Sequence, residues 1–368
     1  MVMAISTGLC AALMLCGVCG DAAVQGDGPR WRPAHELTME GMGWTAVAEP
    51  FSRLPASAHG RVPESVWGLG RHSAGVAVRF VTNSPTVSVR WKLLEGELAM
   101  PHMPATGVSG VDLYARRGNG PWTFVQNGRP AGGLSHETRA GLEAVMQGKA
   151  GPIECLLYLP LYNGCKSVEV GVPSDKSLDP APERPAGRGR PVVFYGTSIV
   201  QGGCASRPGM AHTAILGRRL DRCVINLGFS GSGRMEAVVA DLLAELDPAV
   251  YVIDCLWNMA GMPDAEMAEK VTYLAKALRK EHPSAPILFV GQSSIHSGGK
   301  ESHASQVQAQ AVAALKQAGM TGLHVAPGAA LLRGDEGTVD GVHPTDLGFV
   351  QHADALEPLL RKLLGGGR

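Results

Sequence analysis

The sequence lacks an excess of charge of either sign, because its 33 Lys and Arg residues balance 33 Asp and Glu residues. This balance gives no excess of positive charge with which the protein could bind nucleic acid or an acidic membrane surface. Beyond the N-terminal segment it also lacks an apolar run long enough to span a bilayer. The chain of 368 residues is too long for a typical single core. We expect two domains, no nucleic-acid partner and no membrane insertion.

Beyond the first 20 residues, cysteine pairs with the spacing of a metal site are also missing. The five cysteines beyond the first 20 residues are Cys155, Cys165, Cys204, Cys223 and Cys255. An odd number without CxxC spacing predicts neither a zinc site nor a disulfide framework. Cys155 and Cys165 flank a predicted strand pair, and they could form a bridge in an oxidising compartment or stay as buried thiols. His212, His296 and His324 are isolated, so we predict no metal site and assign them surface or supporting roles.

Basic residues are absent before Arg30. The segment Ile5–Val18 is almost wholly apolar, and small residues follow it at 20, 22 and 23. This pattern indicates a signal peptide over residues 1–23, although the basic start that is usual in such peptides is missing. We expect a secreted or periplasmic protein. The alternatives are an apolar N-terminal strand or a misassigned start codon.

Short segments in which apolar residues alternate with period two occupy residues 30–176. A hairpin is predicted over 76–91, with its turn at Asn83-Ser84-Pro85. Further strands are expected at 113–114, 122–125, 153–159 and 168–170, and a helix is suggested only at 137–146. The pattern predicts an antiparallel β-sandwich, jelly-roll-like, over residues 30–176. Residues 177–190 are rich in Pro, Gly, Arg and Asp and predict a linker.

Continuous apolar runs alternate with helical patterns from residue 191 onward. The runs are Val192–Tyr195, Cys223–Leu227, Val250–Leu256, Ile287–Val290 and a weaker Leu323–Val325. Apolar spacings of three and four predict helices around 267–278, 307–315 and 356–363. Strands buried on both faces of a parallel sheet have such continuous runs. Residues 191–368 are therefore predicted to form a flavodoxin-like, three-layer α/β/α domain with a parallel sheet.

Two turns in this second half contain candidate catalytic groups. Ser198 follows the first buried run by three residues, at the edge of the sheet where open α/β sheets bind ligands. Taken alone it is a candidate nucleophile or a structural turn residue. The glycine-rich segment Asn226–Gly233 follows the next run, and its backbone N–H groups could meet an anion. A phosphate loop is disfavoured, because neither the G-x-G-x-x-G nor the Walker spacing is present.

Two further positions complete a possible catalytic set. Asn258 ends the third run, where its amide could cap a turn or donate a hydrogen bond to an oxyanion. Asp340 precedes His343 by three residues, so its carboxylate can reach the imidazole and leave the other ring nitrogen facing a serine. The alternative is that Asp340 and His343 are ordinary loop residues before a helix capped by Thr345.

In this order of Ser, Gly, Asn and Asp-x-x-His, the chain resembles the SGNH hydrolase (GDSL-type esterase) superfamily. Gly-Thr-Ser-Ile at 196–199 stands for its Gly-Asp-Ser-Leu, and Asp340–Phe349 is similar to its last sequence block. The segment Gly110–Tyr114, together with Tyr158–Asn163, resembles the GxDLY β-domain that precedes a subset of these enzymes. The resemblance covers about residues 40–365, nearly all of the expected mature chain.

The resemblance implies a role for each matching residue. Ser198 would be the nucleophile, His343 the general base and then acid, and Asp340 the residue that orients His343. The oxyanion hole would combine the Ser198 N–H, the Gly231 N–H and the Asn258 side chain. No metal and no cofactor is implied.

The chain departs from the family pattern at two places. Thr197 replaces the acidic residue before the nucleophile, and Leu256-Trp257 replaces the usual glycine before the asparagine. Trp257 is a candidate for narrowing the acyl or sugar pocket. Arg207, in the loop after the nucleophile, is a candidate substrate contact; a salt bridge within the loop is the equal alternative.

The expected activity is hydrolysis of a carboxylic ester through an acyl-serine intermediate. By family analogy the ester is an O-acetyl group on a carbohydrate. One alternative is a thioesterase or lysophospholipase-type hydrolase with the same triad. The other is a glycan-binding protein whose hydrolase domain is vestigial.

Overall fold

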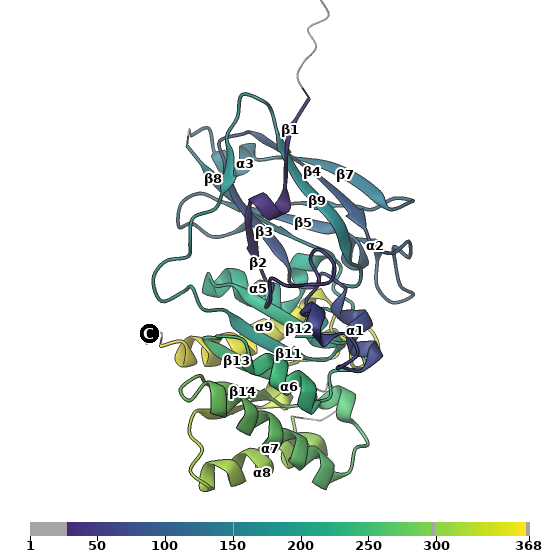
Figure 1. Ribbon diagram of the computed structural model, residues 1–368, viewed down its shortest axis with the longest axis vertical. Helices are drawn as coiled ribbons and strands as arrows, with labels where there is room; N and C mark the ends of the chain where they lie inside the picture. Colours follow the sequence, from purple (N-terminus) through teal and green to yellow (C-terminus); the bar gives the residue numbers. More distant parts are fainter. Residues whose placement is uncertain (1–27, 150, 294, 296–298, 366–368) are drawn as a thin grey trace, which may run out of the picture.

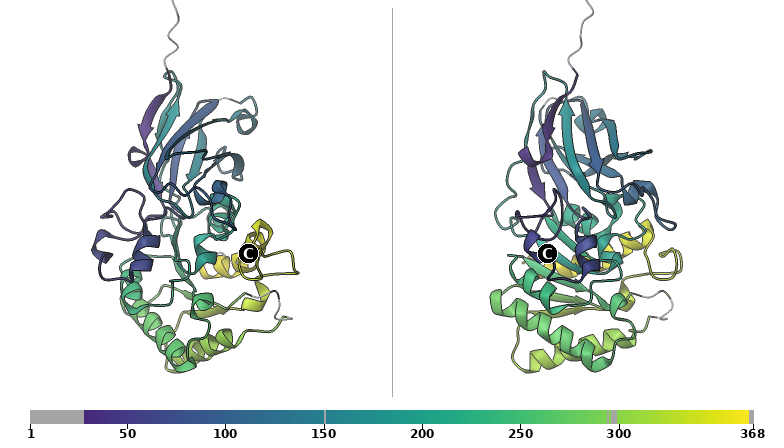
Figure 2. Two further views of the ribbon diagram at one scale, coloured as in Figure 1. Left: turned by 90° about the vertical axis from the view of Figure 1, so that its right-hand side faces the viewer. Right: turned by 45° about the vertical axis from the view of Figure 1, so that its right-hand side comes forward.

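The computed structural model describes residues 28–149, 151–293, 295 and 299–365, so the expected signal peptide lies outside the described residues. Antiparallel sheets form one end of the molecule and an α/β unit forms the other (Figure 1). The same two parts are seen in the rotated views of Figure 2. The predicted fold class, a β-sandwich followed by a parallel α/β sheet, is confirmed.

The first part pairs two antiparallel sheets. One sheet has the order β1 (Arg30–Pro33), β9 (Cys165–Val172), β4 (Thr86–Leu93) and β7 (Ser135–Gly141). The other has the order β10 (Leu178–Pro180), β3 (Ala77–Thr82), β8 (Ile153–Tyr158), β5 (Val111–Arg116) and β6 (Thr123–Gly128), with β2 (Thr38–Glu40) also on β3. Alternate side chains of both sheets, such as Phe80 and Trp91, fill one shared core. The short helices of this part are η1 (Ala34–Glu36), α2 (Ala105–Val108) and α3 (Glu143–Met146).

Two local predictions in this part need correction. The helix suggested at 137–146 is mostly strand β7, because residues up to Gly141 pair with β4, and only Glu143–Met146 are helical. Cys155 and Cys165 are free thiols in the sandwich core, and burial raises the pKa of both.

The middle of the segment between β2 and β3 (residues 41–76) packs on the α/β unit, whereas Phe51 and Val76 lie in the sandwich core. It contains η2 (Ala56–Ala58) and α1 (Glu64–Gly70). Leu54 and Val66 share a core cluster with Phe229 of the second part. Within the predicted domain of residues 30–176, the apolar side chains of residues 54–66 are therefore buried against the α/β unit and not in the sandwich core.

The second part is a five-stranded parallel sheet between two helix layers. The strand order is β12 (Val224–Gly228), β11 (Val192–Gly196), β13 (Val250–Asp254), β14 (Ile287–Val290) and β15 (Leu323–Ala326). One face is covered by α6 (Ala237–Ala244), α7 (Asp264–Glu281) and α8 (His303–Gln317). The other is covered by α5 (His212–Leu220) and α9 (Asp346–Leu363). Short helices are α4 (Ser198–Gln201), η3 (Pro208–Met210), η4 (Leu256–Met259) and η5 (Gly328–Ala330).

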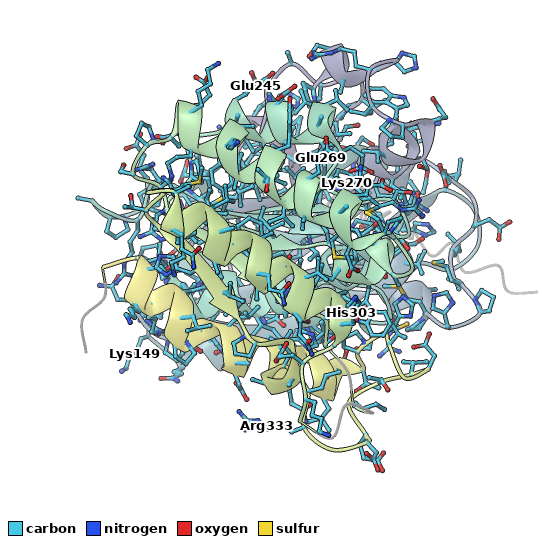
Figure 3. The ribbon with its side chains drawn as sticks, turned by 90° about the horizontal axis from the view of Figure 1, so that it is seen from below. Lys149, Glu245, Glu269, Lys270, His303 and Arg333 are labelled. Atoms are coloured by element: carbon cyan, nitrogen blue, oxygen red, sulfur yellow. The ribbon has the colours of Figure 1, made fainter. Side chains whose placement is uncertain are left out.

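The helices follow from their apolar spacing. In α7 the buried positions are Met267, Val271, Leu274, Ala275 and Leu278, one face of a helix. Figure 3 shows Glu269, Lys270 and His303 on the outward side of this helix layer. None of the helices in the described residues is long and apolar enough to cross a membrane.

The strand order fixes where a ligand could bind. The first strand of the unit, β11, lies between the second, β12, and the third, β13. The connection after β11 therefore runs to β12 on one side, and the connection after β12 crosses back past β11 to β13 on the other. Open sheets bind ligands in the crevice outside the carboxyl ends at such a point. Ser198 follows β11 at this edge, and Asn258 follows β13.

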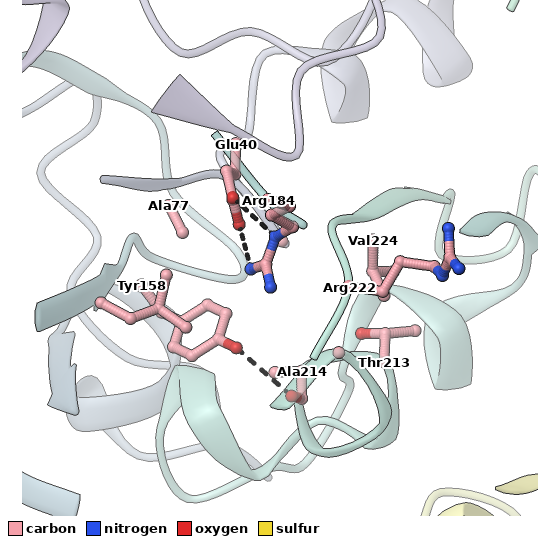
Figure 4. A pocket seen from close by; sticks show the side chains of 11 residues that line it. Glu40, Ala77, Tyr158, Arg184, Thr213, Ala214, Arg222 and Val224 are labelled. Atoms are coloured by element: carbon pink, nitrogen blue, oxygen red, sulfur yellow. Dashed lines mark hydrogen bonds and ion pairs between the residues drawn. The ribbon is translucent and has the colours of Figure 1, made fainter. Parts of the chain in front are cut away.

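The predicted linker is more ordered than its composition indicated. Leu178–Pro180 form β10 on the edge of β3. Arg184 reaches both carboxylate oxygens of Glu40 at 2.9 and 2.7 Å and Oδ1 of Asp221 at 2.9 Å. Figure 4 shows Arg184 beside a cavity of about 20 Å³, room for one water molecule, where the two parts meet. The charged residues of this segment thus hold the two parts together.

Candidate active site

Ser198 is placed by a tight turn at the end of β11. A side chain at Gly196 would collide with the carbonyl of Asp254 on β13, so the strand end requires glycine. Thr197 then caps α4, its hydroxyl accepting the Ile199 N–H at 3.2 Å. The short helix α4 begins at Ser198 itself. This puts Ser198 on a short helix at the carboxyl edge of the sheet.

Ser198, His343 and Asp340 form a hydrogen-bonded chain. Ser198 Oγ lies 2.9 Å from His343 Nε2, and His343 Nδ1 lies 2.7 Å from Asp340 Oδ2. Asp340 Oδ1 also accepts the backbone N–H groups of Val342 and His343, at 3.0 and 2.8 Å. Burial would raise the pKa of Asp340, but its hydrogen bonds from His343 outweigh burial and lower the pKa to about 2. Asp340 is therefore a carboxylate that holds the Nδ1–H tautomer and leaves Nε2 free to take the serine proton.

The loop that carries His343 is closed by its own backbone. The Val339 N–H donates to the His343 carbonyl at 2.8 Å, and Thr338 pairs with Pro344 in an isolated bridge. Thr345 then caps α9 through a hydrogen bond from the Gly348 N–H. The start of the last helix thus sets the position of the imidazole.

The glycine-rich turn after β12 leaves the backbone N–H of Gly231 without a protein acceptor. Gly231 has a φ of +67°, and a side chain there would meet nothing within 4 Å. Among the described residues, neither the Gly231 N–H nor the Ser198 N–H has a hydrogen-bond acceptor. By contrast, a side chain at Gly228 would collide with the backbone of α4, and one at Gly233 with the Gly196 carbonyl. The turn therefore packs tightly at both ends and is open at Gly231.

The side-chain amide of Asn258 is hydrogen-bonded to the backbone of this turn. Its Nδ2 donates to the carbonyls of Phe229 and Gly233 at 3.1 and 3.2 Å. Both of its amide hydrogens therefore have acceptors in the protein, and an oxyanion would have to share one of them. The direct oxyanion contact of Asn258 stays a prediction.

Contacts that local sequence did not reveal surround the nucleophile. Gln201 Nε2 lies 3.1 Å from His72 Nδ1 and donates to the Leu161 carbonyl at 3.2 Å, while its Oε1 accepts the Ser230 N–H at 3.1 Å. Tyr162 donates its hydroxyl hydrogen to the Ser198 carbonyl at 3.3 Å. The position of Gln201 three residues after the serine, on the same helical turn, was the one sequence signal available for these contacts.

His102, in the loop between β4 and α2, also reaches the site from the sandwich. Its ring centroid lies 6.0 Å from that of His343. The two parts of the molecule therefore both contribute side chains around the serine–histidine pair.

Arg207 forms a salt bridge, but with Asp112 on β5 of the first part and not within its own loop. Its Nη1 lies 2.7 Å from both Asp112 Oδ2 and the Tyr114 hydroxyl, and its guanidinium stacks 3.9 Å from the Phe124 ring centroid. Asp112 also accepts the Gly209 N–H at 2.8 Å. The buried Gly110–Tyr114 segment thus anchors the loop that follows the nucleophile. Arg207 also borders an open groove of about 940 Å³ between the two parts.

The remaining candidate residues lie as follows. Trp257 is half-buried on η4 and donates from Nε1 to Ser293 Oγ at 3.2 Å, so its proposed effect on the substrate pocket stays a prediction. His212 is not a surface residue, because it is buried between Phe194 and Phe349. His296 lies outside the described residues. Within the described part, no group of three or more His, Cys, Asp or Glu side chains is placed to hold a metal ion.

Both parts of the chain match known protein families. The profile of the GDSL-like lipase/acylhydrolase family matches residues 189–361, and that of the GxDLY N-terminal domain of SGNH-hydrolase-type esterases matches residues 30–178. A crystal structure of a Bacteroides ovatus protein assigned to the GDSL-like lipases is 33% identical, with a TM-score of 0.79 and alignment over 92% of this chain and 98% of that one. The comparison with curated proteins gives no significant match.

Two more distant structures share the fold. A salicylyl acyltransferase from a tetracycline biosynthetic pathway is 18% identical, with a TM-score of 0.73 over 91% of this chain and 97% of that one. A family two carbohydrate esterase from Cellvibrio japonicus is 14% identical, with a TM-score of 0.61 over 92% and 99%. The family matches and the relative at 33% identity carry the assignment: the chain belongs to the GDSL-like lipase/acylhydrolase family and has the GxDLY N-terminal domain of SGNH-type esterases.

Proposed function

We propose that the protein is a serine esterase that removes O-acetyl groups from carbohydrate. The observation that carries the esterase assignment is the chain of hydrogen bonds from Ser198 Oγ through His343 to Asp340, at 2.9 and 2.7 Å. Membership of the family supports ester hydrolysis as the reaction class. The carbohydrate preference is supported by the shared fold of the Cellvibrio japonicus carbohydrate esterase, a likeness of fold only.

The proposed reaction runs through an acyl-serine intermediate. His343 Nε2 takes the proton of Ser198 as Oγ attacks the ester carbonyl, and Asp340 stabilises the imidazolium. The N–H groups of Ser198 and Gly231 donate to the developing oxyanion, each worth roughly 3 kcal/mol of barrier by analogy with measured oxyanion holes. His343 then gives the proton to the leaving alcohol, and water repeats the sequence to release the acid. No step requires a metal or a cofactor.

Two further proposals concern where the enzyme acts and where the sugar lies. We propose export, on the basis of the apolar segment within residues 1–23 alone. We also propose that the sugar part of the substrate extends toward the groove of about 940 Å³, which is lined by Arg207 and by Phe124, a side chain that is 41% exposed. An aromatic ring at such a site can support a sugar face, as aromatic rings commonly do at sites that bind ligands.

The decisive variant is Ser198→Ala. Loss of the nucleophile should lower kcat for p-nitrophenyl acetate at least about 1,000-fold, because the serine and histidine act as a unit. Ser232→Ala, in the glycine-rich turn, is the matched control and should keep near-normal kcat. Full activity in Ser198→Ala would overturn the mechanism.

Acyl-length profiling and acetate release separate the substrate proposals. A preference for acetyl over octanoyl esters, with acetate released from acetylated xylan or glucomannan, is expected. A preference for long acyl chains or thioesters would instead favour the thioesterase or lysophospholipase alternative. Glycan binding without any ester hydrolysis would favour a vestigial hydrolase domain.

A further inference from the structure

We infer that Arg53, on the segment between β2 and β3, is a positioning residue for the oxyanion turn of the α/β unit. The inference rests on the proposed esterase function. Arg53 touches no substrate position; it acts through the backbone of the glycine-rich turn. Its contribution to catalysis would be to hold the Gly231 N–H where the negative charge develops.

Every hydrogen bond of the Arg53 guanidinium is to a backbone carbonyl. Nη1 donates to the carbonyls of Asn226 and Gly228 at 3.1 and 2.7 Å. Nη2 donates to Leu69 at 2.6 Å, and Nε donates to His72 at 2.9 Å. Two of these carbonyls belong to its own segment, and two stand at the end of β12 where the glycine-rich turn begins. The guanidinium therefore ties the segment to the start of the turn.

Arg53 also carries a charge without a counter-ion. Its exposed fraction is 1%, and no carboxylate among the described residues forms an ion pair with it. Burial lowers its pKa to about 9, so it remains a cation at neutral pH. Burying a charge costs free energy, and here the four carbonyl acceptors offset part of that cost. A cation held below the turn, over the ring of Phe229 at 5.1 Å, favours negative charge in its vicinity.

A second connection starts from the same segment. The backbone carbonyl of His72 accepts from Arg53, and its imidazole contacts Gln201, which accepts the Ser230 N–H. Burial, together with the nearby charge of Arg53, lowers the pKa of His72 to about 3, so the imidazole is neutral and can accept the amide hydrogen of Gln201. The segment thus braces both α4, which carries the nucleophile, and the residue before Gly231.

Together these contacts fix the positions of most residues in the glycine-rich turn. Arg53 holds Gly228, Gln201 holds Ser230, and Asn258 holds Phe229 and Gly233. Gly231 lies at the centre of this set, and its N–H has no acceptor among the described residues. Donors fixed before the reaction lower the barrier, because nothing has to reorganise when the oxyanion forms. Loosening one brace should therefore reduce transition-state binding more than substrate binding.

Arg53→Lys is the first test, because it keeps the charge but cannot span four carbonyls. We expect kcat for p-nitrophenyl acetate to fall about 10- to 100-fold per folded molecule, with KM within about threefold. The affinity of phenylboronic acid, a mimic of the tetrahedral intermediate, should fall by a similar factor. The folded fraction is measured by circular dichroism and thermal unfolding of the full chain.

Arg222→Lys is the matched control. Arg222 is also buried, at 6% exposure, and its Nη1 and Nη2 donate to the carbonyls of Arg190 and Gly187 at 2.7 and 2.5 Å. It stands before β12, at the other end of that strand. This variant should lower Tm without changing kcat or boronate affinity.

His72→Leu provides an independent reading if Arg53→Lys does not fold. It removes the acceptor for Gln201 and leaves the Arg53 contacts with backbone, so kcat should fall about 3- to 10-fold. An unchanged kcat in a folded Arg53→Lys protein, or equal effects of Arg53→Lys and Arg222→Lys, would overturn the inference. Failure of the proposed function is recognised separately: wild type would then show no esterase activity above Ser198→Ala, and a fluorophosphonate probe would not label Ser198.

Discussion

Two aspartates near the carboxyl edge of the sheet, Asp340 and Asp254, differ in the direction in which their surroundings shift the pKa. Asp340 is half-exposed and receives three hydrogen bonds, so it stays ionised. Asp254, at the end of β13, is 4% exposed, and its carboxylate has no hydrogen-bond donor among the described residues. Burial raises the pKa of Asp254 to about 7. Two carboxylates near one edge therefore have opposite protonation behaviour, as their surroundings dictate.

Asp254→Asn should stabilise the protein at alkaline pH. The folded state binds a proton at Asp254 up to about pH 7, whereas an unfolded aspartate releases it near pH 4. Between these values the folded state holds more protons, so stability falls as pH rises. The variant should therefore raise Tm by several degrees at pH 8 and little at pH 4. The exposed Asp247→Asn should show no such pH dependence, and equal shifts at both pH values would contradict the argument.

At the scale of elements, the glycine-rich turn shows why its glycines are not equivalent. Gly228 and Gly233 are needed because backbone atoms approach them closely, whereas Gly231 is needed only for its positive φ. The sequence predicted an anion-binding turn between Asn226 and Gly233. It could not tell these two reasons apart, since close approach depends on α4 and the end of β11.

Gly231→Ala and Gly228→Ala should separate these roles. Alanine at Gly231 keeps the N–H and meets open space, so activity should stay within about threefold while stability falls by about 1–2 kcal/mol. Alanine at Gly228 collides with the backbone of Gln201 and displaces α4, so kcat/KM should fall at least about 100-fold. Activity is measured by p-nitrophenyl acetate kinetics, and stability by thermal unfolding. The reverse ranking would show that the Gly231 conformation, not the packing at Gly228, is critical.

At the scale of the whole molecule, buried ion pairs join the sandwich to the α/β unit. Glu154 on β8 accepts from Arg79 Nη1 and Arg116 Nε, both at 2.7 Å. Arg116 also contacts Asp221, in the turn after α5, at 2.8 Å. The side chains of Arg79, Arg116 and Glu154 are 4%, 9% and 13% exposed. The network is continued by Arg184 of the predicted linker through Glu40 and Asp221.

Glu154→Gln should lower stability without impairing the chemistry. It removes the charge that two buried guanidinium groups share, and breaking such pairs typically costs about 3–5 kcal/mol. We expect a large fall in Tm, with kcat at 25 °C unchanged. Glu169→Gln, which breaks a more exposed pair with Arg90 on the sandwich, should cost at most about 1 kcal/mol. Similar Tm losses in both variants would show that burial does not set the strength of the network.

Local patterns determined much of this protein. Apolar runs defined the five parallel strands, and the Asp340-x-x-His343 spacing placed a carboxylate within one turn of an imidazole, because both features depend on neighbours in the chain. Tertiary structure alone decided how the turn is held. Arg53 meets Gly228 across 175 residues and Gln201 meets His72 across 129, so no local spacing records these contacts. Tertiary structure also decided that residues 54–66 pack outside the sandwich core, since their apolar side chains are buried by a surface that exists only once the distant sheet has formed.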